Sequence, residues 1–254
     1  MIQVDLIRHP REKDYFIVSV VLGVIIWFFA LLATLGIIII YLGFAALTFW
    51  IMEKFFTALI FGDSVKISDR QYPEINNIVN RQCGELAIEK VPDVFIANGQ
   101  GVVNAMAVRF LSKRYVILMS DLVDLMLARG QLDELAMVIG HELGHHAAGH
   151  VNIWRSLLIA PARFVPFLGT AYSRACELTC DRMGYALTGN REASQKALGY
   201  LALGSRNLAS NLNIEAFMEQ EKEVPPFFGF LSLIFSTHPR MTLRVAELSQ
   251  FRYQ

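Results

Sequence analysis

The N-terminal third of the chain is dominated by one long run of apolar residues. No charged residue occurs between Tyr15 and Met52, a stretch of 38 positions bounded by Asp14 and Glu53. As one α-helix this run would be about 57 Å long, nearly twice the thickness of the hydrocarbon core of a bilayer. The pattern therefore predicts two membrane spans of about 18 residues each, joined near residues 34–36, where a glycine supports a turn. One span followed by a segment at the membrane surface stays open as an alternative, because nothing strongly polar marks the turn.

Beyond the apolar run, helical and strand-like patterns alternate. Residues 72–88 carry apolar side chains at helical spacing, and a Val-Pro pair separates them from a short apolar strand at 93–97. Two more short strands are predicted at 102–110 and 114–120, after the glycine-rich turn NGQG. We expect these three strands to form a small sheet packed on a helix. The predicted fold class is mainly α with a small β-sheet (α+β), preceded by a transmembrane helical hairpin.

The sequence QLDELAMVIGHELGHHAAGH, residues 131–150, has the periodicity of a helix with acidic residues at its beginning. His141 and His145 are four residues apart, so on a helix they lie within about 40° of each other and can chelate one metal ion. Glu142 projects from the neighbouring strip of the helix. In this H-E-x-x-H arrangement the glutamate accepts a proton from a water molecule that the metal activates. The helical context disfavours the alternative of surface histidines beside a solvated glutamate.

Two further histidines of this stretch are not expected to bind the metal. The class of site with a third histidine, H-E-x-x-H-x-x-G-x-x-H, is excluded because Ala148 and Val151 occupy the positions of its glycine and its last histidine. On a continued helix His150 lies about 180° from the first histidine of the motif and would not reach the same ion. His146 is interpreted as a packing residue, or as a partner of a ligand.

A third ligand is expected from a later helix, because a catalytic zinc ion takes three protein ligands and one open position. Residues 173–190 place Glu177 and Asp181 at i and i+4, again on one helical face. A glutamate there completes a set of two histidines and one glutamate, and the aspartate can hold the outer nitrogen of a ligating histidine. Taken alone, the pair would better suit a solvated acidic face beside Arg174 and Arg182, and its position after the H-E-x-x-H motif favours the ligand interpretation.

The cysteines offer a competing metal site. Cys176 and Cys180 are also four residues apart, and with His141 and His145 they would make a closed structural site. However, they point about 100° away from the acidic pair of the same helix, which cannot present both pairs to one ion. Free cysteines usually behave as small buried hydrophobes, and we favour that for both of them and for Cys83.

Four motifs together resemble a known family. HELGHHAAGH is followed by ELTCD at 177–181, with NAMA upstream at 104–107 and STHPR downstream at 236–240. The same motifs in the same order characterise the membrane-bound gluzincin metallopeptidases of the HtpX and CAAX prenyl protease type. This resemblance spans residues 104–240 and is far more specific than any one motif. It implies a zincin-like peptidase domain.

The resemblance also implies roles for the residues of the two helical motifs. One Zn²⁺ ion per chain would be bound by His141, His145 and Glu177, with Glu142 as the general base. Asp181 would not bind the metal itself but would accept a hydrogen bond from a ligating histidine.

The two remaining motifs are expected to serve the substrate. By the resemblance, an edge strand around Asn104, Ala105, Met106 and Ala107 would hold an extended peptide, and adding a strand to a sheet edge is a common way to bind one. His238 would approach the site and help to stabilise the developing oxyanion. The competing interpretation of His238 is an ordinary turn residue before a proline.

Composition and charge narrow the partners and the compartment. The chain has 254 residues, 54% of them hydrophobic, and a formal net charge of zero, which argues against a nucleic-acid partner. The expected partners are a protein or peptide substrate and the lipid bilayer. The apolar run is too long for the h-region of a signal peptide, so we expect a multi-pass protein of the inner or plasma membrane. An odd number of cysteines, three, agrees with a reducing compartment.

Charge around the hairpin predicts its orientation. Its two ends carry basic residues, whereas the connecting turn has no charge, so both ends and the catalytic domain are placed in the cytoplasm. The flanking basic residues are Arg8, Arg11, Lys13, Lys54 and Lys66.

One feature departs from the HtpX pattern, whose members have further hydrophobic spans between the two metal motifs. Here that region offers only residues 157–172, interrupted by Pro161, Arg163 and Pro166, and it is too short and broken for two more spans. Residues 225–235 form a second apolar run, also too short to span. We expect both runs to pack in the core, although a place at the membrane surface or over the cleft stays open for the first.

These observations predict an arm at 1–14, a transmembrane hairpin at 15–60 and a zinc metallopeptidase domain at 61–254. The predicted function is zinc-dependent endopeptidase activity on membrane or membrane-proximal proteins, with protein quality control as the candidate role. One alternative is a non-catalytic scaffold with a structural zinc, in which Glu142 would have no purpose. The other is a CAAX-type processing protease, which needs a large intramembrane chamber that two spans build only in an oligomer.

Overall fold

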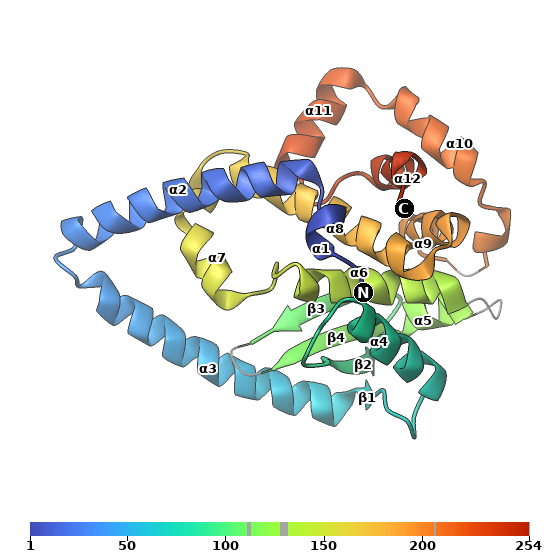
Figure 1. Cartoon of the computed structure of the whole chain (residues 1–254), viewed down its shortest axis with the longest axis horizontal. Helices are drawn as coiled ribbons and strands as arrows, with labels where there is room; N and C mark the ends of the chain where they lie inside the picture. Colours follow the sequence, from blue (N-terminus) through green and yellow to red (C-terminus); the bar gives the residue numbers. More distant parts are fainter. Residues whose placement is uncertain (111–112, 128–131, 206, 254) are drawn as a thin grey trace.

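The computed structural model confirms a mainly helical chain with one small sheet. It describes residues 1–110, 113–127, 132–205 and 207–253. After a short helix α1 (Val4–Ile7), two long helices follow, α2 (Pro10–Ala33) and α3 (Ile38–Asp63), and both are long and apolar enough to cross a membrane. They meet at a turn over residues 34–37 and spread apart from it (Figure 1).

The two long helices fit the predicted transmembrane hairpin. Large apolar side chains such as Phe28, Phe29 and Phe44 are exposed along them, and very little of either apolar segment is buried. Apolar surface of this extent is typical of a face that contacts a membrane or another protein.

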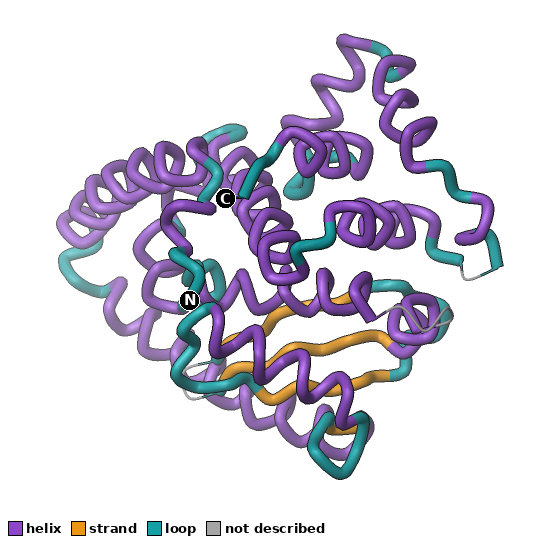
Figure 2. Tube along the Cα trace, turned by 45° about the vertical axis from the view of Figure 1, so that its right-hand side comes forward, coloured by secondary structure: helices purple, strands orange, loops and turns teal. Residues whose placement is uncertain are grey.

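The sheet has four strands in the order β1-β2-β4-β3 and has helices on either side of it (Figure 2). The three predicted strands are present, and a two-residue strand at the other edge was not predicted. β2 and β4 are parallel, whereas β1–β2 and β3–β4 are antiparallel, so β3 is an edge strand. The strands are β1 (Val65–Lys66), β2 (Asp93–Ala97), β3 (Ala105–Arg109) and β4 (Arg114–Met119).

Alternating residues of the central strands face two different layers. Val94, Val116 and Leu118 belong to the main core, together with residues of α4 (Pro73–Glu85), α5 (Ser120–Leu127) and α6 (Leu132–Ala147). Phe95, Tyr115 and Ile117 point to the opposite face, where they pack against Phe49, Phe56 and Ile60 of α3. Because successive side chains of a strand point to opposite faces of the sheet, α3 packs on one face and α6 packs on the other.

The helices that carry the two metal motifs, α6 and α8 (Leu168–Thr188), cross in close contact because glycines line the crossing. A Cβ atom on Gly184 of α8 would lie 2.6 Å from the carbonyl oxygen of Met137 in α6. Gly140 of α6 faces the same point, with the Gly184 Cα atom 3.1 Å from an added Cβ. This close approach brings the histidines of α6 and the acidic pair of α8 together.

We expect Gly184→Ala to destabilise the protein by about 1–3 kcal/mol, because the new methyl group meets backbone rather than a flexible side chain. Gly84→Ala is the matched control, since nothing lies within 4 Å of an added Cβ at this helical glycine. Replacing a helical glycine by alanine in open space is neutral or stabilising. Thermal unfolding of both variants checks the prediction, and equal midpoints would refute the close crossing.

The rest of the chain surrounds α8. Its elements are α7 (Ile153–Ile159), η1 (Pro161–Phe164), α9 (Arg191–Leu203), η2 (Ala209–Asn211), α10 (Ile214–Glu219), η3 (Gln220–Glu223), α11 (Pro226–Phe235) and α12 (Met241–Gln250). The prediction that residues 157–172 and 225–235 pack in the core is wrong for four large side chains of each run. These are Leu157, Leu158, Phe164 and Phe167, and Phe227, Phe228, Phe230 and Phe235. Apolar composition alone does not distinguish a core side chain from one that faces lipid.

Candidate metal centre

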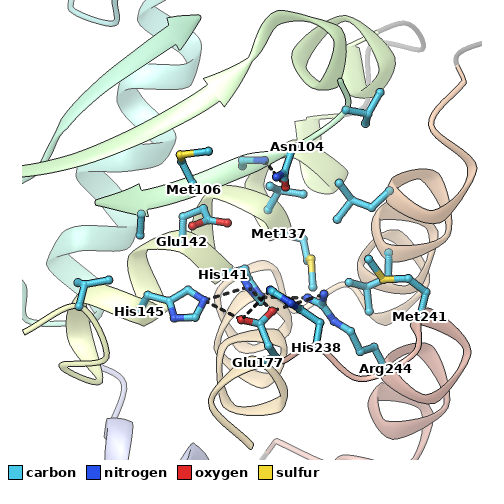
Figure 3. Close-up of a pocket in the computed structure, with 17 residues that line it drawn as sticks. Asn104, Met106, Met137, His141, Glu142, His145, Glu177, His238, Met241 and Arg244 are labelled. Atoms are coloured by element: carbon cyan, nitrogen blue, oxygen red, sulfur yellow. Dashed lines mark hydrogen bonds and ion pairs between the residues drawn. The ribbon is translucent and has the colours of Figure 1, made fainter. Parts of the chain in front are cut away.

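Three side chains from α6 and α8 converge on one point. His141 Nε2 lies 3.3 Å from His145 Nε2 and 3.5 Å from Glu177 Oε2, and His145 Nε2 lies 3.4 Å from Glu177 Oε1 (Figure 3). Donors that bind a zinc ion tetrahedrally at about 2.0–2.1 Å are roughly 3.3 Å from each other. The three predicted ligands therefore have the separations that one tetrahedral ion requires.

A buried carboxylate supports the first histidine from behind. Asp181 Oδ1 lies 2.9 Å from His141 Nδ1, which leaves Nε2 of the same ring for a metal. Burial lowers the pKa of His141, but Asp181 and Glu177 outweigh it and raise this pKa to about 10. Because a ligating imidazole must be neutral, metal binding has to displace a proton here.

Arg244 of α12 balances the negative charge of the site. Its Nε and Nη2 atoms each donate to Asp181 at 2.7 Å, and its Nη1 lies 3.5 Å from Glu177 Oε2. Burial raises the pKa of Asp181, but the guanidinium outweighs it and keeps the pKa of this carboxyl below its ordinary value. The arginine thus keeps Asp181 ionised in a buried place, whereas His141 and His145 do more than Arg244 to lower the pKa of Glu177.

The second histidine is supported from another direction. His150 Nδ1 lies 3.1 Å from His145 Nδ1, and His150 Nε2 lies 3.0 Å from Glu12 Oε1 at the beginning of α2. The expectation that His150 lies on the far side of a continued helix is wrong, because α6 ends at Ala147 and Gly149, with φ of +75°, turns the chain back. His150 still does not join the three converging donors, but it holds the outer nitrogen of one of them.

The other histidine of this stretch packs in the core as expected. His146 Nε2 lies 3.0 Å from the carbonyl oxygen of Tyr115, and burial lowers the pKa of His146 to about 4.

Within the part of the chain that the structure describes, two other groups of side chains lie close enough to hold a metal, but their chemistry is less suitable. They are His145, His150 and Cys180, and Glu12, His150 and Cys176. Burial raises the pKa of Cys176 to about 12 and that of Cys180 well above its ordinary value, which disfavours the thiolate form that binds metals. Glu12 is already paired with Arg8 and Arg155. All three cysteines are free and buried, as predicted.

A cavity of about 330 Å³ opens beside the three converging donors. Glu142 lines it, and Figure 3 shows its carboxylate between Met106 of β3 and the histidine pair. Asn104, Ala105 and Ala107 line the same cavity, with Asn104 preceding the strand rather than belonging to it. The edge strand therefore borders the candidate centre along one wall.

His238 reaches the centre from the loop between α11 and α12. Its Nε2 lies 3.7 Å from Glu177 Oε1, and its side chain, 62% exposed, also lines the cavity. The structure thus brings this histidine beside the metal motifs, although about 90 residues separate it from the end of α6 in the sequence.

Comparison with known proteins agrees with this geometry. The model of peptidase family M48 matches residues 69–159 and 151–252, which include all the predicted site residues. The chain belongs to peptidase family M48. Peptidases of this family depend on a metal, and the converging donors supply a place for one.

A curated relative carries a metallopeptidase name. The "Plastoglobule-localized metallopeptidase 48, chloroplastic" of Arabidopsis thaliana is 28% identical over 176 residues, which cover 63% of this chain and 49% of the relative. The M48 chain thus spans about half the length of that relative.

Sequence reasoning missed three residues of this M48 site: Glu12, His150 and Arg244. Arg244 lines the same cavity as His238. Its position six residues after His238 is only a weak signal in the sequence. For His150, the signal was Gly149, since glycine often ends a helix with a left-handed turn. Nothing in the sequence links Glu12 to the centre.

Proposed function

We propose that this M48 peptidase is a zinc-dependent, membrane-anchored endopeptidase that cleaves membrane or membrane-proximal proteins, with quality control as its candidate role. The observation that carries the proposal is the set of three donors, His141, His145 and Glu177, at tetrahedral separations. Two imidazoles and one carboxylate are a ligand set of catalytic zinc with one open position. We assign one zinc ion per chain to these residues.

The remaining polar residues of the centre have separate roles in the proposed reaction. A bound zinc ion would supply Lewis acidity and lower the pKa of water near it. Glu142 takes the proton of the attacking water and returns it to the leaving amine. Asp181, held by Arg244, fixes the ring of His141. His238 donates a hydrogen bond to the carbonyl oxygen on which negative charge develops.

Strand β3 is the proposed substrate-binding strand. It lies at the edge of the sheet and borders the cavity that contains Glu142. Its free edge can pair with an extended peptide, whose scissile bond then lies beside the metal. Asn104, Ala105, Met106 and Ala107 would line that peptide.

The membrane anchor is the hairpin of α2 and α3. We propose that both helices span the bilayer and that the catalytic domain, residues 61–254, lies in the cytoplasm, on the side of the basic flanking residues. The arm at 1–14 lies on the same side, where Ile2 and Ile7 are buried in the catalytic core. Of the two related types, we favour the HtpX type, because two spans of one chain do not build the chamber of a CAAX-type protease.

Cleavage of an unfolded protein by the detergent-purified chain tests the activity. We expect internal cleavage products in mass spectrometry, loss of cleavage after chelation, and recovery on addition of zinc. Products that lose only terminal residues would contradict an endopeptidase. Cleavage that persists in the fully chelated protein would contradict metal dependence.

A second prediction concerns the partner of His145. We expect His150→Leu to weaken zinc affinity about 10- to 100-fold, the usual effect of removing the group that orients a ligating histidine. His150→Gln keeps a polar group at that position and should lose less. Competition with a zinc-binding dye measures both affinities, and unchanged affinity in the leucine variant would show that the contact does not support the metal.

A further inference from the structure

The segment from α7 to η1, residues 153–164, follows the first metal motif and has no role in the proposed chemistry. In the view of Figure 1, α7 lies between the two long helices, and both α7 and η1 contact α2. Phe164 is 89% exposed and Trp154 is 69% exposed, and Leu157 and Leu158 are exposed as well. The segment contains no acidic residue. A surface of this composition is unusual for a protein in water.

The contacts of this segment with α2 show how far it extends along that helix. The indole Nε1–H of Trp27 donates to the Leu157 carbonyl oxygen at 3.0 Å. The Leu158 carbonyl oxygen approaches Gly23 so closely that an added Cβ there would lie 2.3 Å away. Gly23 and Trp27 are about 12 and 18 Å along α2 from Tyr15, where the uncharged run begins. In a hydrocarbon core about 30 Å thick, these contacts lie near its middle.

After this deepest point the chain returns along the same helix. Ile159, at the end of α7, packs in one cluster with Tyr172 and Cys176 of α8 and with Tyr15, Phe16 and Val20 of α2. These residues of α2 are closer to its beginning than Gly23 is. The chain therefore advances along α2, turns between Leu157 and Ala160 and comes back to the catalytic domain.

Several polar groups of the segment are paired within the protein, as a place in a bilayer requires. The turn at its tip is closed by backbone hydrogen bonds from Ala160 to Leu157 and from Arg163 to Ala160. Arg155 is paired with Glu12 and covers the ring of Phe16. Arg163 is the one exposed charge among residues 153–164, and it lies on the returning limb, where a long side chain can reach the membrane surface.

We propose that residues 153–164 form a re-entrant segment that enters the bilayer beside α2 and leaves it on the same side. The occupant of its apolar surface is lipid hydrocarbon, because that surface continues the exposed surface of the hairpin. This inference rests on the membrane anchor of the proposed function. It explains how a chain without further spans between its metal motifs contacts the membrane in that region.

The returning limb of the segment borders the candidate centre. A second cavity, of about 410 Å³, is lined by Arg163, Gly169 and Tyr172 and by the proposed metal ligands His145 and Glu177. Arg163 is the residue of the segment that lines this cavity, so the limb that leaves the bilayer lies beside the proposed metal site.

Depth measurements on the full chain test the inference. A nitroxide label is attached to one introduced cysteine at a time, Leu157→Cys or Phe164→Cys, in vesicles of phosphatidylcholine and phosphatidylglycerol. The native cysteines are buried, which protects them from the reagent. Phe28→Cys on α2 is the reference inside the membrane, and Val91→Cys, exposed before β2, is the reference in water. The quantity measured is the ratio of the label's collision rate with oxygen to its collision rate with a water-soluble nickel complex. We expect this ratio at positions 157 and 164 to be similar to that at position 28 and severalfold higher than that at position 91.

Two other outcomes would contradict the proposal, and they distinguish the re-entrant segment from the membrane anchor. If position 28 is in lipid while 157 and 164 resemble 91, the re-entrant segment is wrong and the membrane anchor stands. If position 28 itself resembles 91, the anchor and the segment both fail. The metal-dependent cleavage assay is independent of both results.

Discussion

Glu142→Gln should lower peptide hydrolysis by about 10²- to 10⁴-fold, the usual contribution of a positioned general base, while zinc stays bound. Glutamine keeps the size of the side chain but does not accept a proton. Glu142 is not one of the three converging donors, so the zinc site should survive. Its carboxylate borders the cavity where the peptide would lie.

Cleavage rate and zinc content measured on the same preparation check this result. Asp133→Asn is the matched control, an exposed acidic residue in the first turn of the same helix, and it should cleave at the native rate. A Glu142→Gln protein that cleaves at the native rate would refute the role of Glu142 as the general base. One that loses its zinc would show that Glu142 holds the metal rather than a proton.

Arg244→Leu should destabilise the protein by about 3–5 kcal/mol, because removing one partner of a buried ion pair leaves an uncompensated charge. Asp181 is fully buried and receives two hydrogen bonds from this arginine, and Glu177 lies beside it as well. Without the guanidinium, Asp181 would take up a proton or leave its place behind His141. Zinc affinity should therefore fall together with stability.

Thermal unfolding with and without zinc separates the two effects. Arg81→Leu is the control, since Arg81 is exposed and its nearest carboxylate, on Glu85, is 3.7 Å away, a type of pair that contributes at most about 1 kcal/mol. A drop in the unfolding midpoint of Arg244→Leu similar to that of the control would contradict the buried charge balance described here.

The parts of the site that follow from local spacing were predictable. His141 and His145, like Glu177 and Asp181, are one helical turn apart, so each pair shares a face whatever the rest of the fold. The three strands were predicted for a similar reason, since apolar runs between turn residues define them. What the spacing did not supply is the crossing of α6 and α8, which depends on glycines that meet only in three dimensions.

The missed residues depend on long-range docking. Glu12 meets His150 across 138 positions of sequence, and Arg244 meets Asp181 from another helix. In both contacts a residue of a recognisable helical motif binds a partner from a distant part of the chain, and no local spacing identifies that partner. The apolar runs at 157–172 and 225–235 were misplaced for a different reason, because an exposed apolar side chain has the same composition as one in a core.

Zinc K-edge X-ray absorption on the purified, zinc-loaded chain tests the central claim most directly. With His141, His145 and Glu177 as ligands, the ion should show only nitrogen and oxygen neighbours, with the multiple scattering of two imidazole rings and no sulfur. A sulfur neighbour at about 2.3 Å would place the metal on the group of His145, His150 and Cys180 and would contradict the proposed catalytic centre.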